Sequence, residues 1–213
     1  MKAIVYDRYG SPDVLQYQEI EKPIPADDQV LIQVRASSAN PYDWHFIRGT
    51  PSFIRLFTGI RAPKSRRAGA DVAGVVEAAG RNVTSFKPGD PIFGTAVGSF
   101  AEYACAPASS VALKPESLTW EQAASLPIAG VTALQGLRDK GRVRAGQSVL
   151  INGAAGGVGN TGAVTVTGAT GAGTSDAGAA AAATGAVAST GVSCNNSCET
   201  LTMSSRVTCD FTR

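Results

Sequence analysis

The composition of the chain changes abruptly at residue 160, and this change limits what the chain can fold into. The 213 residues include 19 basic and 17 acidic side chains, but residues 160–213 hold only five of these charges. That segment consists mainly of Ala, Thr, Gly and Ser, and Leu201 is its only Leu or Ile. We expect it to be poorly ordered, because it cannot bury enough apolar surface to offset the entropy of ordering.

The charge balance and the cysteine content exclude several classes of protein. The formal net charge is +2, which gives no electrostatic footprint for nucleic acid or for an anionic membrane surface. No run of about 20 predominantly apolar residues is present to cross a bilayer, and the start does not resemble a secretory signal. Four cysteines are too few for a disulfide-rich secreted scaffold. We therefore expect a cytoplasmic protein without membrane or nucleic-acid partners.

Residues 1–118 alternate short β-rich runs with turns that contain Gly and Pro. Pro88 and Gly89 form a strong turn signal, because Pro fixes φ at the first corner and Gly accepts a positive φ at the second. Many short strands separated in this way predict a small β-barrel or sandwich. The predicted strands cover residues 3–6, 30–34, 71–77, 92–94 and 100–104.

A helical pattern replaces the strands from Thr119 onward, which predicts a domain boundary in this part of the chain. Thr119 and Gln122 have the spacing of a capping box, in which each side chain bonds to the backbone N–H of the other residue. We expect Pro127 and Gly130 to divide the following apolar stretch into two helices, the second ending near Gly141.

A glycine cluster directly follows a predicted strand at residues 148–152. Gly153, Gly156 and Gly159 have the spacing G-x-x-G-x-x-G, and glycines allow a backbone to turn tightly and approach a diphosphate. The position after an apolar strand favours a dinucleotide-binding loop over a purely structural one. The helix and second strand that normally follow are not predicted, because the next residues alternate β-branched residues with glycines. An acidic residue that binds the ribose is expected about 20 residues after the glycine loop. Asp176 lies near that position, but no strand is predicted around it.

Several further motifs run in order through residues 1–159. They are residues 38–44 (SANPYDW), 69–76 (GADVAGVV), 86–90 (FKPGD), 98–103 (GSFAEY), 123–127 (AASLP) with 132–133 (TA), and 149–159 (VLINGAAGGVG). With these motifs the chain resembles the medium-chain dehydrogenase/reductase superfamily, most closely its zinc-independent, zeta-crystallin-like quinone oxidoreductase branch. The resemblance implies a mixed α/β fold, in which a GroES-like β-barrel domain precedes an incomplete Rossmann domain, and hydride transfer from NAD(P)H.

The resemblance divides the chain into three segments. Residues 1–118 form the GroES-like substrate domain, and residues 119–159 form a helical bridge, the first strand and the glycine loop of the Rossmann domain. Residues 160–213 are a low-complexity remainder, too short for the rest of a doubly wound sheet, because one βαβ unit needs about 30 residues. We interpret the chain as truncated, with a tail that arose from a reading-frame disturbance. The cysteines of this tail lack a nearby His, so a metal site there is disfavoured.

The resemblance also bears on metal and substrate. Zinc-dependent members hold the metal through a Cys and a His-Glu pair at positions that match Asn40, Ala70 and Asp71, where an amide and a methyl group cannot replace the thiolate and imidazole. We therefore expect no zinc, and an acceptor that is already electrophilic, namely a quinone or an α,β-unsaturated carbonyl. The family branch favours NADPH over NADH, and an intact relative is expected to be a homodimer.

Asn40 and Tyr42 are the candidate catalytic residues, which would polarise the acceptor oxygen. Tyr42 matches a hydroxyl residue that relays protons in the zinc-dependent branch. The alternative is that Asn40 and Pro41 only make a turn, which Asp43 caps. A lone His45 is more typical of a packed or surface residue than of a base.

The candidate cofactor-binding residues lie on the predicted helix and on the glycine loop. By the resemblance Thr132 helps to place the nicotinamide, and the alternative is an ordinary helix residue. The basic run of Lys64, Arg66 and Arg67 is more typical of a solvated loop than of a cofactor clamp. A non-catalytic fragment is the alternative function, while near-neutral charge argues against a nucleic-acid-binding relative. The loop candidates are Gly153, Ala154, Gly156, Gly157, Val158 and Gly159.

Overall fold

The computed structural model describes residues 1–144, 147–154, 156–159 and 207–208. The chain divides into two compact units, residues 1–127 and residues 128–213. The predictions made for Asp176 and for the three C-terminal cysteines concern positions outside the described residues. The same is true of most of the low-complexity segment.

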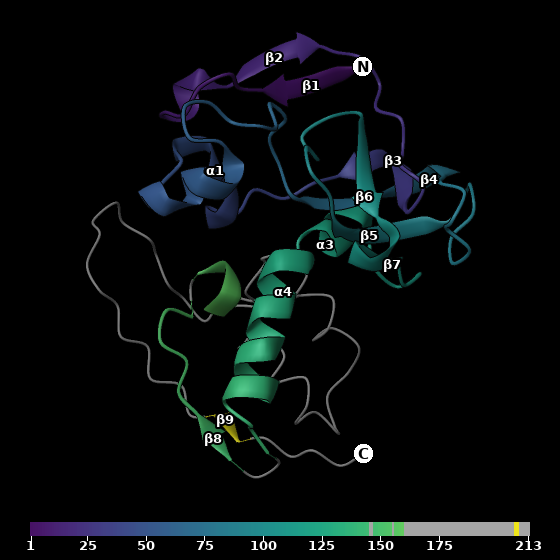
Figure 1. The fold of residues 1–213 in the computed structure, drawn as a ribbon. Helices are drawn as coiled ribbons and strands as arrows, with labels where there is room; N and C mark the ends of the chain where they lie inside the picture. Colours follow the sequence, from purple (N-terminus) through teal and green to yellow (C-terminus); the bar gives the residue numbers. More distant parts are fainter. Residues whose placement is uncertain (145–146, 155, 160–206, 209–213) are drawn as a thin grey trace. The chain divides into compact units, whose positions relative to one another are not determined.

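A five-stranded antiparallel sheet with the order β6-β3-β4-β5-β7 forms the centre of the first unit (Figure 1). The mixed α/β content and the small β-domain predicted from the sequence are therefore confirmed. Four of the five predicted strands lie where they were expected, and the polar β2 and the short β7 were not predicted. The strands of the sheet are β3 (Gln29–Ala36), β4 (Asp71–Ala79), β5 (Pro91–Thr95), β6 (Tyr103–Pro107) and β7 (Val111–Leu113).

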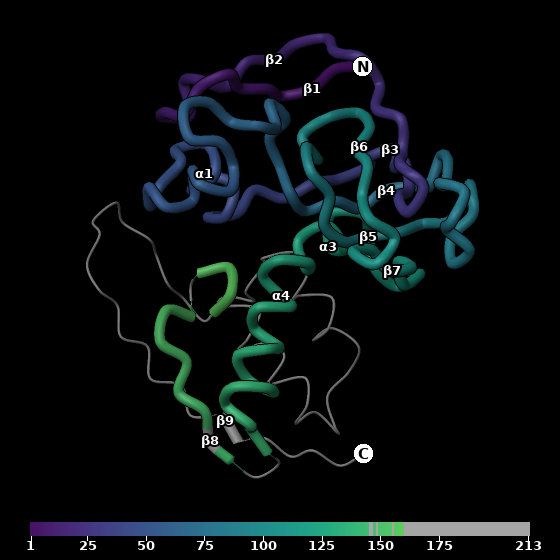
Figure 2. Tube along the Cα trace, in the orientation of Figure 1, coloured from purple at the N-terminus to yellow at the C-terminus, as the bar shows by residue number. Residues whose placement is uncertain are grey.

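A separate two-stranded antiparallel pair, β1 (Lys2–Val5) and β2 (Gln16–Glu19), lies beside this sheet. Ile4 of β1 donates its N–H to the Phe100 carbonyl at 2.8 Å and accepts from the Ala68 N–H at 3.1 Å. Figure 2 shows the loop between α1 and β4 returning beside β1. The strand predicted at residues 100–104 was therefore misplaced, because its first residues pair with β1 and β6 begins three residues later.

One core cluster of the first unit is formed mainly by side chains of the five-stranded sheet. Its side chains are β-branched or small, as expected for strands whose residues pack tightly on a pleated surface. Full burial of each large aliphatic side chain contributes about 1.5–3 kcal/mol. The buried residues of this cluster are Val30, Ile32, Val72, Val76, Ile92, Ala96, Ala104 and Ala106.

Short helical segments connect the strands of the first unit. The longest is α1 (Pro41–Arg48), which lies below the β1–β2 pair in Figure 1. α3 packs against β4 through Ala73, Ala123 and Ala124. The remaining segments are α2 (Arg55–Thr58), α3 (Trp120–Ala124) and the single turns η1 (Pro12–Val14), η2 (Ser52–Ile54) and η3 (Ala108–Ser110).

The capping box predicted at Thr119 is confirmed. The Thr119 N–H donates to Gln122 Oε1 at 2.9 Å, and the Gln122 N–H donates to Thr119 Oγ1 at 3.2 Å. A new helix begins at Pro127 as predicted, but the break predicted at Gly130 is wrong. Gly130 lies inside α4 (Pro127–Leu134), since the cost of about 1 kcal/mol for one internal Gly does not stop a helix with apolar neighbours.

The described residues of the second unit continue this helix and begin a small sheet. η4 (Gln135–Lys140) extends α4 as a π-helix and ends at Gly141, as predicted. The predicted strand at residues 148–152 is shortened to β8 (Ser148–Val149), which pairs antiparallel with β9 (Val207–Thr208). Within the described ranges no helix is long and apolar enough to cross a membrane.

Candidate functional site

The N-terminal end of α1 is fixed by local sequence. Asn40 is the N-cap residue and Pro41 occupies the first helical turn, where its missing N–H costs nothing. The Asn40 N–H donates to Asp43 Oδ2 at 2.7 Å, and Gly49 ends the helix in the left-handed conformation with φ 60°. The capping role of Asp43, which the sequence offered as an alternative, is therefore present in the structure.

A buried polar network holds the Asn40 side chain on one side of α1. Asn40 Nδ2 donates to Asp71 Oδ2 at 2.9 Å and to Ser38 Oγ at 3.2 Å, so both amide hydrogens are engaged. Ser38 Oγ donates to the same Asp71 oxygen at 2.9 Å, and Asp71 is fully buried. Ser37 Oγ donates to the Asp71 carbonyl at 2.6 Å.

Sequence analysis did not identify Asp71 as a functional residue. A signal was available, because Asp71 begins an apolar run that becomes the buried strand β4. A carboxylate in such a position needs hydrogen-bond partners to offset its desolvation. The partners come from residues 37–40, which are distant in sequence, so the network itself could not be read from local pattern.

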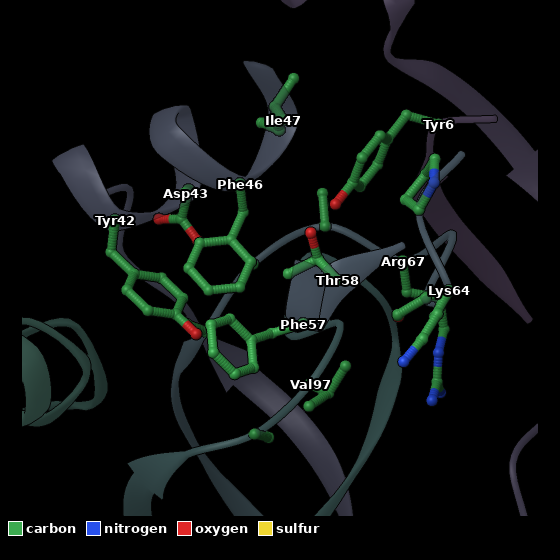
Figure 3. Close-up of a pocket in the computed structure, with 16 residues that line it drawn as sticks. Tyr6, Tyr42, Asp43, Phe46, Ile47, Phe57, Thr58, Lys64, Arg67 and Val97 are labelled. Atoms are coloured by element: carbon green, nitrogen blue, oxygen red, sulfur yellow. The ribbon is translucent and has the colours of Figure 1, made fainter. Parts of the chain in front are cut away.

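A cavity of about 250 Å³ lies beside α1 (Figure 3). Tyr42 and Phe46 line it, with their rings stacked at a centroid distance of 4.1 Å. Tyr42 belongs to the lining and Asn40 does not, so the structure separates the two catalytic candidates. The other main lining groups are Tyr6, residues 57–58 of α2, residues 63–65, residues 67–70 and residues 96–97.

Burial changes the ionisation of two groups on the α1 wall. It raises the pKa of the Tyr42 hydroxyl, with a smaller contribution from the nearby Asp43 charge, so the phenol is protonated at neutral pH. Burial also raises the pKa of the Asp43 carboxyl, opposed by the Asn40 N–H and reinforced by the charge of Asp71. Tyr42 can therefore donate a hydrogen bond to an oxygen atom in the cavity.

The structure divides the basic run that was interpreted as a solvated loop. Arg66 forms a surface ion pair with Asp7, consistent with that interpretation. Lys64, which is also exposed, and the half-buried Arg67 line the cavity, on the side away from Tyr42 in Figure 3.

His45 and Thr132 have structural contacts. His45 Nδ1 lies 2.8 Å from the Thr50 carbonyl, and its ring packs edge-on against Trp44, as expected for a packed histidine. Thr132 is exposed on α4, and its hydroxyl donates to the Ile128 carbonyl at 2.6 Å, a bond typical of an ordinary helix residue.

The glycine loop forms a tight turn followed by a helical turn. Gly153 has φ 72°, a conformation that favours glycine, and its carbonyl accepts from the Gly156 N–H at 2.9 Å. Residues 157–159 begin a helical turn, although no helix was predicted there. A Cβ at Gly159 would lie 2.2 Å from the Gly153 carbonyl oxygen, so only glycine fits. Ala154 and Val158 complete the described loop, and Val158 is exposed.

The donor groups near Asn40 do not resemble a zinc site. Ala70, which replaces an imidazole in the resemblance, presents a methyl group to the cavity, and the Asn40 amide is committed to Asp71. In the part of the chain that the structure describes, no three His, Cys, Asp or Glu side chains are grouped as metal ligands.

Comparison with known proteins agrees with this architecture. The family described as the alcohol dehydrogenase GroES-like domain matches residues 26–116. The quinone oxidoreductase of Sus scrofa is 42% identical over 162 residues, which cover 75% of this chain and 47% of that protein. The chloroplastic NADPH-dependent alkenal/one oxidoreductase of Arabidopsis thaliana is 38% identical over 171 residues, which cover 75% of this chain and 42% of that protein.

A solved structure gives the same result. The quinone oxidoreductase from Coxiella burnetii has a TM-score of 0.70 at 35% identity, covering 78% of this chain and 52% of that chain. The chain thus spans about half the length of the curated relatives it matches. Sequence motifs, fold and relatives therefore agree: residues 26–116 match the alcohol dehydrogenase GroES-like domain, and the chain is similar to about half of a quinone oxidoreductase of the medium-chain dehydrogenase/reductase superfamily.

Proposed function

We propose that the chain belongs to an NADPH-dependent oxidoreductase that transfers hydride to a quinone or an α,β-unsaturated carbonyl without zinc. Residues 1–118 would provide the substrate side, and residues 119–159 would bridge to the coenzyme. The observation that carries the proposal is the cavity of the GroES-like domain, with stacked aromatic rings and a protonated Tyr42 hydroxyl at its wall.

The cavity suits a flat, conjugated acceptor. Phe46 and Phe57 offer apolar ring surface to such a molecule, and Tyr42 offers a hydrogen-bond donor to its carbonyl oxygen. Reduction of a quinone requires one hydride and one proton, and the coenzyme supplies the hydride when it is bound. Tyr42 would stabilise the charge that develops on oxygen and deliver the proton from solvent.

Zinc-free chemistry is supported by the groups present. The Asn40 amide is engaged with Asp71 and Ser38, and Ala70 has no donor atom. A quinone or enone is electrophilic without a Lewis acid, so these residues suffice for an acceptor of that kind. We assign Asn40 a structural role within the network, in place of direct catalysis.

The glycine loop fits a diphosphate group. The positive φ of Gly153 and the close approach of Gly159 to its carbonyl create a turn that side chains would fill. Gly156, Gly157 and Ala154 would complete the cradle, and Thr132 would contact the nicotinamide. The names of relatives such as the Arabidopsis enzyme support NADPH as the coenzyme.

One observation favours the alternative of a non-catalytic chain. β8 has two residues and its described partner, β9, runs antiparallel to it. A dinucleotide-binding sheet is built from parallel strands. A chain with this arrangement would keep the substrate cavity but lack a competent coenzyme half.

Coenzyme binding by the full chain separates the two functions. Titration with NADPH, followed by its fluorescence, should give saturable binding, and added phenanthrenequinone should cause oxidation of NADPH. Gly159→Ala should weaken NADPH binding by at least about tenfold, because the new Cβ collides with the Gly153 carbonyl. Gly136→Ala is the matched control, since its Cβ would meet no atom within 4 Å. Absence of saturable NADPH binding by the parent chain would establish the non-catalytic alternative.

A further inference from the structure

Two basic side chains line the cavity on the side away from Tyr42. Figure 3 shows the nitrogen atoms of Lys64 and Arg67 there, with the Phe57 ring between them and Tyr42. Across the described ranges, neither cation has an ion-pair or side-chain hydrogen-bond partner. Cations at the wall of a largely apolar cavity favour a ligand of opposite charge.

The position of Arg67 is fixed by its neighbours in the fold. Arg67 forms a β-bridge with Val5, and the next residue, Ala68, donates its N–H to Ile4 of β1. The Arg67 stem crosses Gly98, where an added Cβ would lie 2.5 Å from Arg67 Cβ. Because Gly98 has no side chain, the aliphatic part of Arg67 can occupy the space beside it. A side chain held in this way loses less freedom when a ligand binds.

Lys64 and Arg66 show that the basic run is not uniform. The Lys64 N–H donates to the Thr58 carbonyl at 2.6 Å, which ties the backbone of the lysine to α2. Arg66 pairs with Asp7 and does not line the cavity. The run therefore contains two cavity cations and one surface cation of similar sequence context.

The acidic group of the cavity does not cancel these charges. Of the described residues that line it, Asp43 is the only one with a carboxylate. Its Oδ2 accepts from the Asn40 N–H, and Figure 3 shows it beside Tyr42, away from Lys64. The part of the wall formed by Lys64 and Arg67 is therefore positively charged.

We infer that this cavity selects acceptors that carry an anionic substituent, such as a carboxylate or sulfonate, held by Lys64 and Arg67 while the conjugated ring lies against the aromatic wall. The inference rests on the proposed function and specifies its substrate class. The same two cations could attract a phosphate of the coenzyme, so the experiment has to distinguish an anionic acceptor from NADPH.

Equilibrium dialysis of the full chain against a matched pair of probes tests the inference. The probes are anthraquinone sulfonate and its neutral hydroxymethyl analogue, which share one ring system. The sulfonate should bind at least about tenfold more tightly at low salt, and added salt should reduce this preference. Lys64→Met and Arg67→Met, which keep the apolar stems, should each weaken sulfonate binding about tenfold and leave the neutral probe within about twofold.

Arg66→Met is the matched control and should leave both affinities unchanged. Equal affinity for the two probes, equal losses for both probes, or failure of the sulfonate to bind would each overturn the inference. It would also be overturned if NADPH or inorganic phosphate displaced the sulfonate and Arg67→Met weakened NADPH binding by the same factor. If the sulfonate preference holds while NADPH fails to bind, the proposed function fails and the ligand class stands.

Discussion

Two groups of side chains at the N-terminal end of α1 differ in their hydrogen-bond partners. In the first group, Asn40, Ser38 and the buried Asp71 satisfy one another through hydrogen bonds of 2.9 to 3.2 Å. Tyr42, by contrast, lines the cavity with its ring stacked on Phe46, and among the described residues its hydroxyl has no hydrogen-bond partner. The first group is hydrogen-bonded within the protein, and we propose that the second takes part in the chemistry.

This difference shows why proximity in sequence is a poor guide to catalytic role. Asn40 and Tyr42 are two residues apart, and both side chains can donate a hydrogen bond. The N-cap position directs one of them toward β4, and the first helical turn directs the other toward the cavity. The hydrogen-bond partners of a polar residue at a helix N-terminus therefore have to be known before the residue is assigned a role in catalysis.

Removal of the Asp71 carboxylate should have the largest effect, because it weakens the hydrogen-bond network around Asn40. Asp71→Ala deprives the Asn40 amide and the Ser38 hydroxyl of a buried acceptor, which should lower the free energy of unfolding by about 3 kcal/mol. Urea denaturation provides the measurement. Asp13→Ala is the control, since Asp13 is exposed and should change stability by less than about 0.5 kcal/mol. Equal effects of the two substitutions would show that the network does not stabilise the fold.

Removal of the Tyr42 hydroxyl should lower the rate of the proposed reaction. Tyr42→Phe keeps the ring stack but removes the donor to the acceptor oxygen, so kcat with a quinone should fall about tenfold while acceptor affinity changes little. Steady-state NADPH oxidation gives kcat, and dialysis gives the affinity. Tyr17→Phe, at an exposed position on β2, should leave both unchanged. An unchanged kcat in Tyr42→Phe would remove Tyr42 from the mechanism.

Asp43 accepts a hydrogen bond from the Asn40 N–H and also lines the cavity. Its titration therefore reports on both regions. Its pKa is raised in the folded state, so folding binds the proton more tightly and this contribution to stability is lost as pH rises above 3.8. Asp43→Asn keeps an acceptor for the Asn40 N–H but cannot titrate. The variant should therefore lose less stability than the parent as pH rises, measured by urea denaturation across a pH series. Asp13→Asn should behave like the parent, and a parallel pH profile for Asp43→Asn would contradict the assignment.

Local patterns predicted the parts of the fold whose partners are close in sequence. The Thr119 capping box needs only Gln122, and the turn at Pro88 and Gly89 closes through Lys87 and Asp90. Both were predicted correctly. β2 was missed because its sequence, QYQE, has little β character and the strand exists through its pairing with β1.

The candidate site was less predictable, because its geometry depends on long-range pairing. Tyr42 was identified from the motif around it, and the structure places it at the cavity. Arg67 was interpreted as a loop residue, because its bridge to Val5 spans more than sixty residues of sequence. The Asp71 network joins segments separated by about thirty residues in the same way. Local periodicity contains no information on either contact.

Of the residues that the structure describes, those that line the cavity all lie between Tyr6 and Val97. Under the proposed function, the choice of acceptor would be encoded in a stretch of sequence that does not include the groups expected to hold the electron donor. Recombination could exchange this stretch among relatives and transfer a chemical preference with it, leaving the reducing half untouched. A designer who wishes to redirect such an enzyme can therefore treat what it reduces and what it oxidises as separate problems.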